Sequence, residues 1–286
     1  MTMGRRGGAD ADSGEAEAAA RVAGSSGLLT SLQRRFLYFP ARGFIASPRD
    51  QGFEHEDVHL VAGDGVPIHA WWLPVGGASR TVLFLHGNAG NVSYWLDVAA
   101  TFRDVGWNTL LIDYRGYGKS QGTPTEIGTY LDARAAWRHL VLDRGIDADR
   151  LVIAGRSLGG GVATWLALEQ ECAGLVLEAT FTSIADVVSD SLPLPGIGRL
   201  VRLGYESLAR IPRISVPLLV VHGRQDELVP FAHGRRLHQA ARDPKQFVEL
   251  AGGHNDAFSL DRATYLEGLR KFARMLDEYT RARQTM

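Results

Sequence analysis

Short apolar runs alternate along most of this chain with segments in which apolar residues recur at helical spacing. Runs rich in Val, Ile and Leu predict buried strands, and the longer periodic segments predict helices. The predicted strands lie around 58 and at 68–73, 81–85, 109–113, 151–154, 175–177, 216–221 and 246–250. The helices are expected at 94–105, at 126–142, directly after 157, after 230 and at the C-terminus. This alternation is typical of an α/β fold, with a mostly parallel central sheet flanked by helices on both faces.

The N-terminal segment does not follow this pattern. Residues 1–27 are rich in Gly, Ala, Ser and charged residues and lack apolar periodicity, which predicts a disordered tail. Residues 28–286 are expected to form one domain. Residues 28–39 are amphipathic and basic, so we expect either a helix packed on the domain or a weak contact with a membrane surface. No secretory signal or bilayer-spanning run is found, and we expect a cytoplasmic protein, peripheral to a membrane only if residues 28–39 bind one.

An insertion from about 181 to 214 interrupts the alternation of strands and helices. Long connections at the carboxyl edge of such a sheet commonly have a function, so we predict a small lid over the active site. Leu192 and Leu194 are the lid residues expected to contact substrate. The alternative is a helical pair that packs on the domain without touching substrate.

The segment 151–161 carries the most specific chemical signal. An apolar strand runs directly into Gly155-Arg156-Ser157-Leu158-Gly159 and then into a helical pattern. Such a turn lifts the serine side chain out of the loop, above a helix N-terminus that favours negative charge. Gly155 and Gly159 are needed because a Cβ would collide with the crossing backbone. Because the strand and helix accompany the motif, we predict that Ser157 is a nucleophile.

A serine hydroxyl needs a base that accepts its proton and a third group that orients the base. Asp226 follows the strand at 216–221, and His254 lies on a glycine-rich loop after the strand at 246–250. Their order after the serine is the order found in strand–turn–helix hydrolases, so we predict that Asp226 is the acid and His254 the base. Glu178 and Glu227 remain alternatives for the acid.

The loop at 86–91 follows the predicted central strand and contains mostly small residues. Backbone N–H groups from such a loop, together with the N–H after the nucleophile, can bind the negatively charged oxygen that forms during acyl transfer. We therefore predict an oxyanion hole made by Asn88 and Leu158, with Ala89 as the alternative to Asn88. Ala89 and Tyr114 are also expected to contact substrate.

Charge and cysteine content narrow the function classes. A formal net charge of −1 gives no reason to expect a nucleic-acid partner. The single cysteine, Cys172, cannot form an internal disulfide. Histidine, cysteine and acidic residues do not occur at metal-binding spacings, so we expect neither a metal ion nor an organic cofactor.

Five motifs in order give the chain a family resemblance; they are His86–Asn91, Asp113–Ser120, Gly155–Gly160, His222–Pro230 and His254. Together they resemble the α/β-hydrolase family, and more closely the branch of bud-emergence-type and ABHD-type serine hydrolases. The resemblance runs from about Phe36 to near the C-terminus. It implies the α/β-hydrolase fold, a Ser157–Asp226–His254 triad and an esterase- or thioesterase-like reaction.

These motifs predict a serine hydrolase that cleaves a small-molecule acyl ester or thioester through an acyl-enzyme intermediate. An aminopeptidase-type serine peptidase of the same fold is one alternative, although it would usually carry an extra domain or a cluster of acids for the peptide amine. A non-catalytic binding module is another alternative, although a pure binder needs none of the three triad residues.

Overall fold

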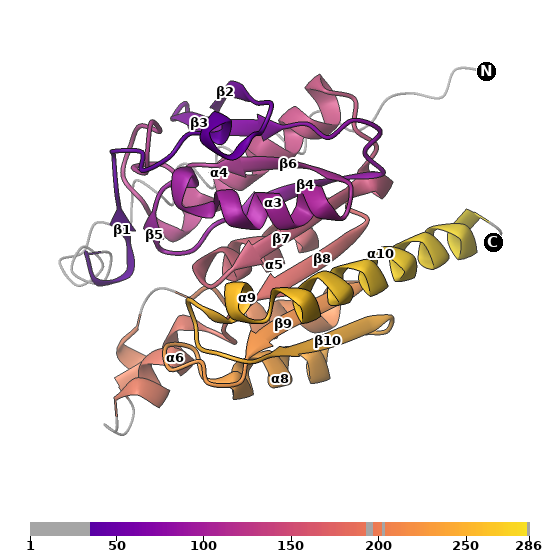
Figure 1. The fold of residues 1–286 in the computed structure, drawn as a ribbon. Helices are drawn as coiled ribbons and strands as arrows, with labels where there is room; N and C mark the ends of the chain where they lie inside the picture. The colour runs from indigo at the N-terminus through magenta and orange to yellow at the C-terminus, as the bar shows by residue number, and fades with distance from the viewer. Residues whose placement is uncertain (1–34, 193–196, 202–203, 285–286) are drawn as a thin grey trace, which may run out of the picture.

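The computed structural model describes residues 35–192, 197–201 and 204–284. An eight-stranded sheet runs through the molecule in the order β10-β9-β8-β7-β4-β6-β3-β2 (Figure 1). Neighbours from β10 to β6 pair in parallel, whereas β3 is antiparallel to both β6 and β2. The strands are β2 (Glu56–Val61), β3 (Pro67–Leu73), β4 (Arg80–Leu85), β6 (Trp107–Ile112), β7 (Leu151–Arg156), β8 (Gly174–Glu178), β9 (Leu218–Gly223) and β10 (Lys245–Leu250). The predicted α/β class with a mostly parallel sheet is confirmed.

Helices cover both faces of this sheet. Helices α4, α5 and α8 pack on one face, and α3, α9 and α10 pack on the other. Every residue of β4, β7, β8 and β9 is buried, which explains why most of each strand is apolar in the sequence, with polar residues only at the strand ends. The helices are α3 (Leu96–Asp104), α4 (Glu126–Arg138), α5 (Leu158–Glu169), α6 (Ile184–Ser191), α7 (Ser207–Arg210), α8 (Phe231–Ala240), α9 (Ala257–Leu260) and α10 (Arg262–Gln284).

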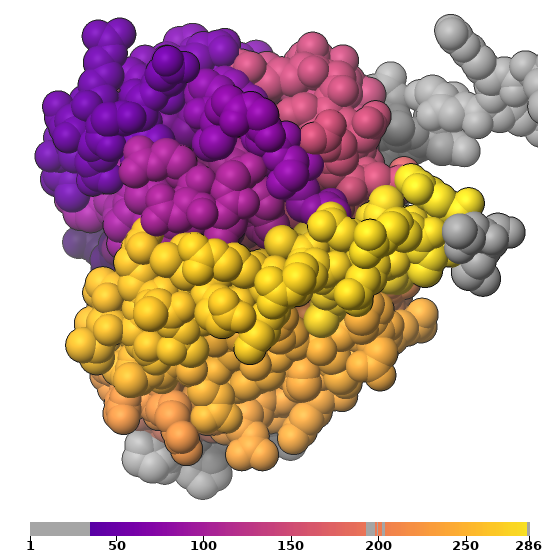
Figure 2. Space-filling view, turned by 45° about the vertical axis from the view of Figure 1, so that its right-hand side comes forward, coloured from indigo at the N-terminus to yellow at the C-terminus, as the bar shows by residue number. Residues whose placement is uncertain are grey.

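The long C-terminal helix α10 packs its apolar stripe on the sheet. Its buried residues, Tyr265, Gly268, Leu269, Phe272 and Leu276, recur at helical spacing. Figure 2 shows this helix in yellow, lying between the N-terminal half of the chain and the orange segment that contains β9 and β10. The helix therefore bridges the two halves of the sheet.

Residues 35–43 lie against the loop that follows β4. Strand β1 (Phe39–Pro40) pairs in parallel with β5 (Ala89–Gly90) to form a separate two-stranded sheet. The side chains of Phe36 and Phe39 are 74% and 52% exposed. The tail at 1–27 and most of the predicted amphipathic segment lie outside the described residues, so tail disorder and membrane contact stay predictions.

The insertion between β8 and β9 contains α6, a 3₁₀ turn at Ile197–Leu200, α7 and a second 3₁₀ turn at Ile211–Arg213. The Ser183 side chain begins α6 by accepting a hydrogen bond from the Asp186 N–H (3.0 Å). Figure 1 shows α6 at the same end of the sheet as β1 and β5. The insertion therefore lies where the loops after β4, β7 and β9 also emerge.

Glycine allows α5 to lie unusually close to the sheet. A Cβ on Gly159 would overlap the carbonyl oxygen of Leu85, and a Cβ on Gly155 would overlap the carbonyl oxygen of Gly159. Backbone atoms cannot move away as a flexible side chain can, so neither position has room for a side chain.

We predict that Gly159→Ala lowers the free energy of unfolding by at least about 3 kcal/mol, because the added methyl group pushes α5 away from β4. Gly76→Ala is the matched control, since a Cβ at Gly76 has no neighbour within 4 Å. Urea unfolding of both variants measures the difference. Equal stability of the two variants would contradict the close approach.

Candidate active site

Ser157 lies at the sharp turn between β7 and α5. Its backbone has φ of 53° and ψ of −117°, a conformation that is strained for a residue with a side chain. Three hydrogen bonds hold it: the Ser157 N–H donates to the Glu178 carbonyl (2.9 Å), and the Ser157 carbonyl accepts from the Gly160 N–H (3.0 Å) and the Thr180 hydroxyl (2.7 Å). The end of β8 therefore stabilises the strained turn.

Ser157, His254 and Asp226 form a continuous chain of hydrogen bonds. The Ser157 Oγ lies 3.1 Å from His254 Nε2, and His254 Nδ1 lies 2.8 Å from Asp226 Oδ2. An ionised carboxylate only accepts hydrogen bonds, so the Nδ1–H of His254 donates to it. This tautomer leaves Nε2 free to accept the proton of the serine hydroxyl.

Asp226 is held as a carboxylate by donors on its own loop. Its Oδ1 accepts hydrogen bonds from the backbone N–H groups of Leu228 (3.0 Å) and Val229 (2.8 Å), and His222 Nε2 lies 3.3 Å from its Oδ2. Burial acts to raise the pKa of Asp226, but the hydrogen bonds from His222, His254 and Val229, and the positive charge of His254 whenever that ring is protonated, lower it well below its ordinary value. The carboxylate therefore stays ionised at neutral pH.

The two alternative acids lie in different surroundings. Glu178 is fully buried, with Oε2 accepting from Arg156 Nε (2.8 Å) and Oε1 accepting from the Tyr265 hydroxyl. Glu227 is exposed on the loop beside Asp226. Of the three acids, Asp226 is the one within hydrogen-bond distance of His254.

A cavity of about 370 Å³ opens beside Ser157. Apolar side chains from five separate parts of the chain form most of its wall. They are Leu37, Ala89, Trp95, Leu158, Phe181, Ile184, Val187, Leu228 and Val229. Such a wall, with a few polar groups at one end, suits the acyl part of a small ligand.

Two residues expected to contact substrate, Tyr114 and Leu192, do not line this cavity. Tyr114 is fully buried and donates its hydroxyl hydrogen to the His86 carbonyl (3.2 Å), where it supports the loop after β4. Leu192 follows α6, is 47% exposed and lies outside the cavity wall. Leu194 lies outside the described residues. The first turns of the insertion, with Phe181, Ile184 and Val187, supply the wall instead.

Sequence reasoning missed most of this apolar wall. Phe181 and Ile184 open the insertion that was expected to form a lid, so their position offered a signal. Leu228 and Val229 immediately follow Asp226 in its loop. Leu37 and Trp95 carry no local signal, because only the folding of distant segments brings them to the cavity.

The loop after β4 presents Gly87, Asn88 and Ala89 to the cavity beside Leu158. The Asn88 carbonyl accepts hydrogen bonds from the Phe39 N–H (2.9 Å) and the Tyr117 hydroxyl (2.7 Å), and the Asn88 side-chain amide donates to the Leu37 carbonyl (3.2 Å). The Leu158 N–H is the first of helix α5, where N–H groups lack partners within the helix. The contacts of the Asn88 carbonyl orient the peptide group that carries the Ala89 N–H, whereas the peptide group that carries the Asn88 N–H is held through the Gly87 carbonyl, which lies 2.7 Å from His86 Nδ1.

The described part of the chain contains no group of three or more His, Cys, Asp or Glu residues arranged to hold a metal ion. Within the same residues, no helix combines the length and the apolar character needed to cross a bilayer.

Comparison with known proteins identifies the family. Residues 80–197 match the family model described as the alpha/beta hydrolase fold. An uncharacterized protein of Mycobacterium tuberculosis is 38% identical over 87% of this chain and 90% of its own length. An alpha/beta hydrolase domain-containing protein of Arabidopsis thaliana is 34% identical over 86% of this chain and 90% of its own length. The solved structure of a Pyrococcus furiosus esterase shares the fold, with a TM-score of 0.68 and 23% identity over 84% of this chain and 98% of that one. This protein belongs to the α/β-hydrolase family.

Proposed function

We propose that this protein is a serine hydrolase that cleaves carboxylic esters or thioesters through an acyl-enzyme intermediate on Ser157. The observation that carries the proposal is the hydrogen-bonded chain from Ser157 through His254 to Asp226, which ends at an apolar cavity. The hydrolase fold and the esterase among its structural neighbours support hydrolysis as the reaction class.

The reaction begins when His254 Nε2 accepts the hydroxyl proton of Ser157 and Oγ attacks the substrate carbonyl carbon. The C=O π bond opens, and the negative charge moves to the oxygen. The N–H groups of Leu158 and Asn88 are the proposed donors to this oxygen, with Ala89 as the alternative to Asn88. Asp226 stabilises the positively charged imidazole that forms.

Collapse of this intermediate breaks the bond to the leaving group, which takes the proton from His254 Nε2 and departs as an alcohol or thiol. The acyl group remains on Ser157 Oγ. Water then attacks the acyl carbon while His254 accepts its proton, and collapse of the second intermediate returns that proton to Ser157 as the carboxylic acid leaves.

The cavity favours an acyl chain of short to medium length. Its volume of about 370 Å³ lies near the lower end of the range of small-molecule sites, ~300–1,000 Å³. Its described wall contains no aspartate or glutamate, which an aminopeptidase-type peptidase would use to bind a free amine. An ester or thioester with an uncharged acyl group therefore fits this wall better than a peptide N-terminus.

Ser157→Ala is expected to abolish covalent labelling by a fluorophosphonate probe and to lower kcat by about 10⁵-fold or more, because the attacking oxygen is removed. Ser259→Ala is the matched control, since Ser259 is an exposed serine outside the cavity wall. Labelling followed by mass spectrometry, together with ester hydrolysis, measures both effects. Normal labelling of folded Ser157→Ala would overturn the assignment of the nucleophile.

Asp226→Asn is expected to impair mainly catalysis, whereas Glu178→Gln is expected to impair mainly stability. Asp226→Asn should lower kcat by about 10³-fold or more, because His254 loses the partner that sets its tautomer. Glu178→Gln should lower the free energy of unfolding by about 3–5 kcal/mol, since Arg156 keeps a buried charge without its partner, but kcat of the folded fraction should stay within about tenfold. If Glu178→Gln proved the more damaging to kcat, Glu178 would be the acid.

Val187→Phe is expected to shorten the preferred acyl chain. The larger side chain fills part of the cavity, so kcat/KM should fall at least about tenfold for longer p-nitrophenyl esters and little for the acetate ester. Leu192→Ser is the control, because Leu192 lies outside the wall. An unchanged chain-length profile for Val187→Phe, or an equally altered one for Leu192→Ser, would contradict the proposed acyl site.

A further inference from the structure

Strand β10 forms one edge of the central sheet, paired with β9 on one side only among the described residues. The Leu218 N–H donates to the Pro244 carbonyl (3.1 Å), and the Arg224 N–H donates to the Leu250 carbonyl (2.9 Å). In a parallel ladder of this register, the even-numbered residues of β10 direct their backbone groups toward β9. The N–H and C=O groups of Lys245, Phe247 and Glu249 therefore point to the open edge.

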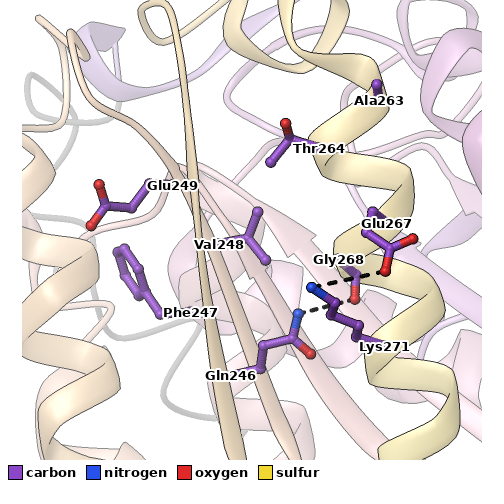
Figure 3. A pocket seen from close by; sticks show the side chains of 9 residues that line it. All are labelled: Gln246, Phe247, Val248, Glu249, Ala263, Thr264, Glu267, Gly268 and Lys271. Atoms are coloured by element: carbon purple, nitrogen blue, oxygen red, sulfur yellow. Dashed lines mark hydrogen bonds and ion pairs between the residues drawn. The ribbon is translucent and has the colours of Figure 1, made fainter.

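The side chains of β10 alternate between two faces. Gln246 and Val248 face α10, where Gln246 Nε2 donates to the Gly268 carbonyl (3.1 Å) and a Cβ at Gly268 would collide with Val248 (Figure 3). A groove of about 550 Å³ lies between β10 and α10. Phe247 faces the opposite way, toward α8, where its ring centroid lies 5.6 Å from that of Phe231. The open edge is thus flanked by a groove on the α10 side.

We propose that a second copy of this chain pairs with β10 in antiparallel fashion, about a two-fold axis that passes beside Phe247. In this register Phe247 lies opposite Phe247 of the second copy, and Lys245 lies opposite Glu249 of the second copy. All outward N–H and C=O groups of these three residues are then paired, because residues two apart form successive hydrogen-bonded pairs. Val248 of the second copy comes opposite Gln246 and covers the mouth of the groove.

Charge complementarity favours this occupant. A lone lysine on an edge strand normally opposes self-association, since two copies would bring their charges together. Here Lys245 and Glu249 lie at equal distances along the strand on either side of Phe247. A two-fold axis beside Phe247 therefore places Lys245 of each copy opposite Glu249 of the other copy, on the same face of the sheet. Glu249 is exposed and its carboxylate lies 3.4 Å from Arg224, so it can accept a second cation. Lys245 Nζ donates to the Ala241 carbonyl (2.8 Å) at the end of α8, but an ammonium has three N–H donors and can still donate to a carboxylate.

The other edge of the sheet offers no lysine or arginine for such a pair. Strand β2 contains Glu56 and Asp57, and His59 is its one basic side chain. Both acids already have cationic partners within their own chain, since Glu56 lies 2.7 Å from Arg144 and Asp57 lies 3.0 Å from Lys119. Self-complementary placement of opposite charges is what a two-fold interface requires, whereas a strand from an unrelated protein does not require it. These features favour a second copy at β10.

Charge exchange tests the register. Lys245→Glu and Glu249→Lys, each alone, should weaken dimerisation by roughly tenfold or more, because both symmetry-related pairs become repulsive. An equimolar mixture of the two variants should dimerise again, because one copy then carries two acids and the other two lysines at these positions. Sedimentation velocity over a range of concentrations measures all three samples and the wild type. Recovery in the mixture also shows that each variant is folded.

Removal of one outward N–H tests the backbone pairing. Glu249→Pro should abolish the dimer, whereas Glu249→Ala keeps the N–H and should dimerise better than the proline variant; melting curves check that both variants are folded. Hydrogen exchange should show protection of the Phe247 amide that grows with the concentration of the wild-type protein. The proposal is overturned if the wild-type protein stays monomeric, or if both single charge variants dimerise as strongly as the wild type. Either result overturns it even if the edge of β10 binds a strand from another protein.

Discussion

The contact that most of this structure depends on is the packing of helix α5 directly against the backbone of the sheet. Gly159 lies against the carbonyl of Leu85, and Gly155 lies against the carbonyl of Gly159. This approach forces the sharp turn between them, so Ser157 adopts a positive φ that costs free energy of order 1–3 kcal/mol. The hydrogen bonds from the end of β8 offset part of that cost.

Parallel strands then bring the remaining groups to the serine. The loops after β4, β7, β9 and β10 all emerge at one edge, so Asn88, Ser157, Asp226 and His254 meet although up to 97 residues separate hydrogen-bonded partners among them. The loops after β4, β7 and β9 follow fully buried strands, and the loop with His254 follows the edge strand β10. The positions of the polar groups therefore depend on the rigidity of the sheet rather than on the loops alone.

This dependence explains how much the sequence could predict. Residues that directly follow an apolar strand, such as Ser157 and Asp226, could be assigned to one edge because strand ends are visible as ends of apolar runs. Tyr114 also follows a strand, but whether its ring turns into the core or the cavity depends on the loop at 86–91, which packs on it. The cavity wall depends on how the insertion folds back, and no periodicity of the sequence encodes that.

Residues 35–43 also could not be placed from the sequence pattern. They contact both the loop that contains Asn88 and the cavity wall. Strand β1 has two residues and no periodic pattern, yet it pairs with β5 and holds the Asn88 carbonyl, while Leu37 forms part of the cavity wall. The Tyr38 hydroxyl lies 2.7 Å from that of Tyr205, which joins this segment to the insertion. The segment before the sheet thus contacts the loop beside Ser157, the cavity and the insertion between β8 and β9, so a shift in it would alter all three.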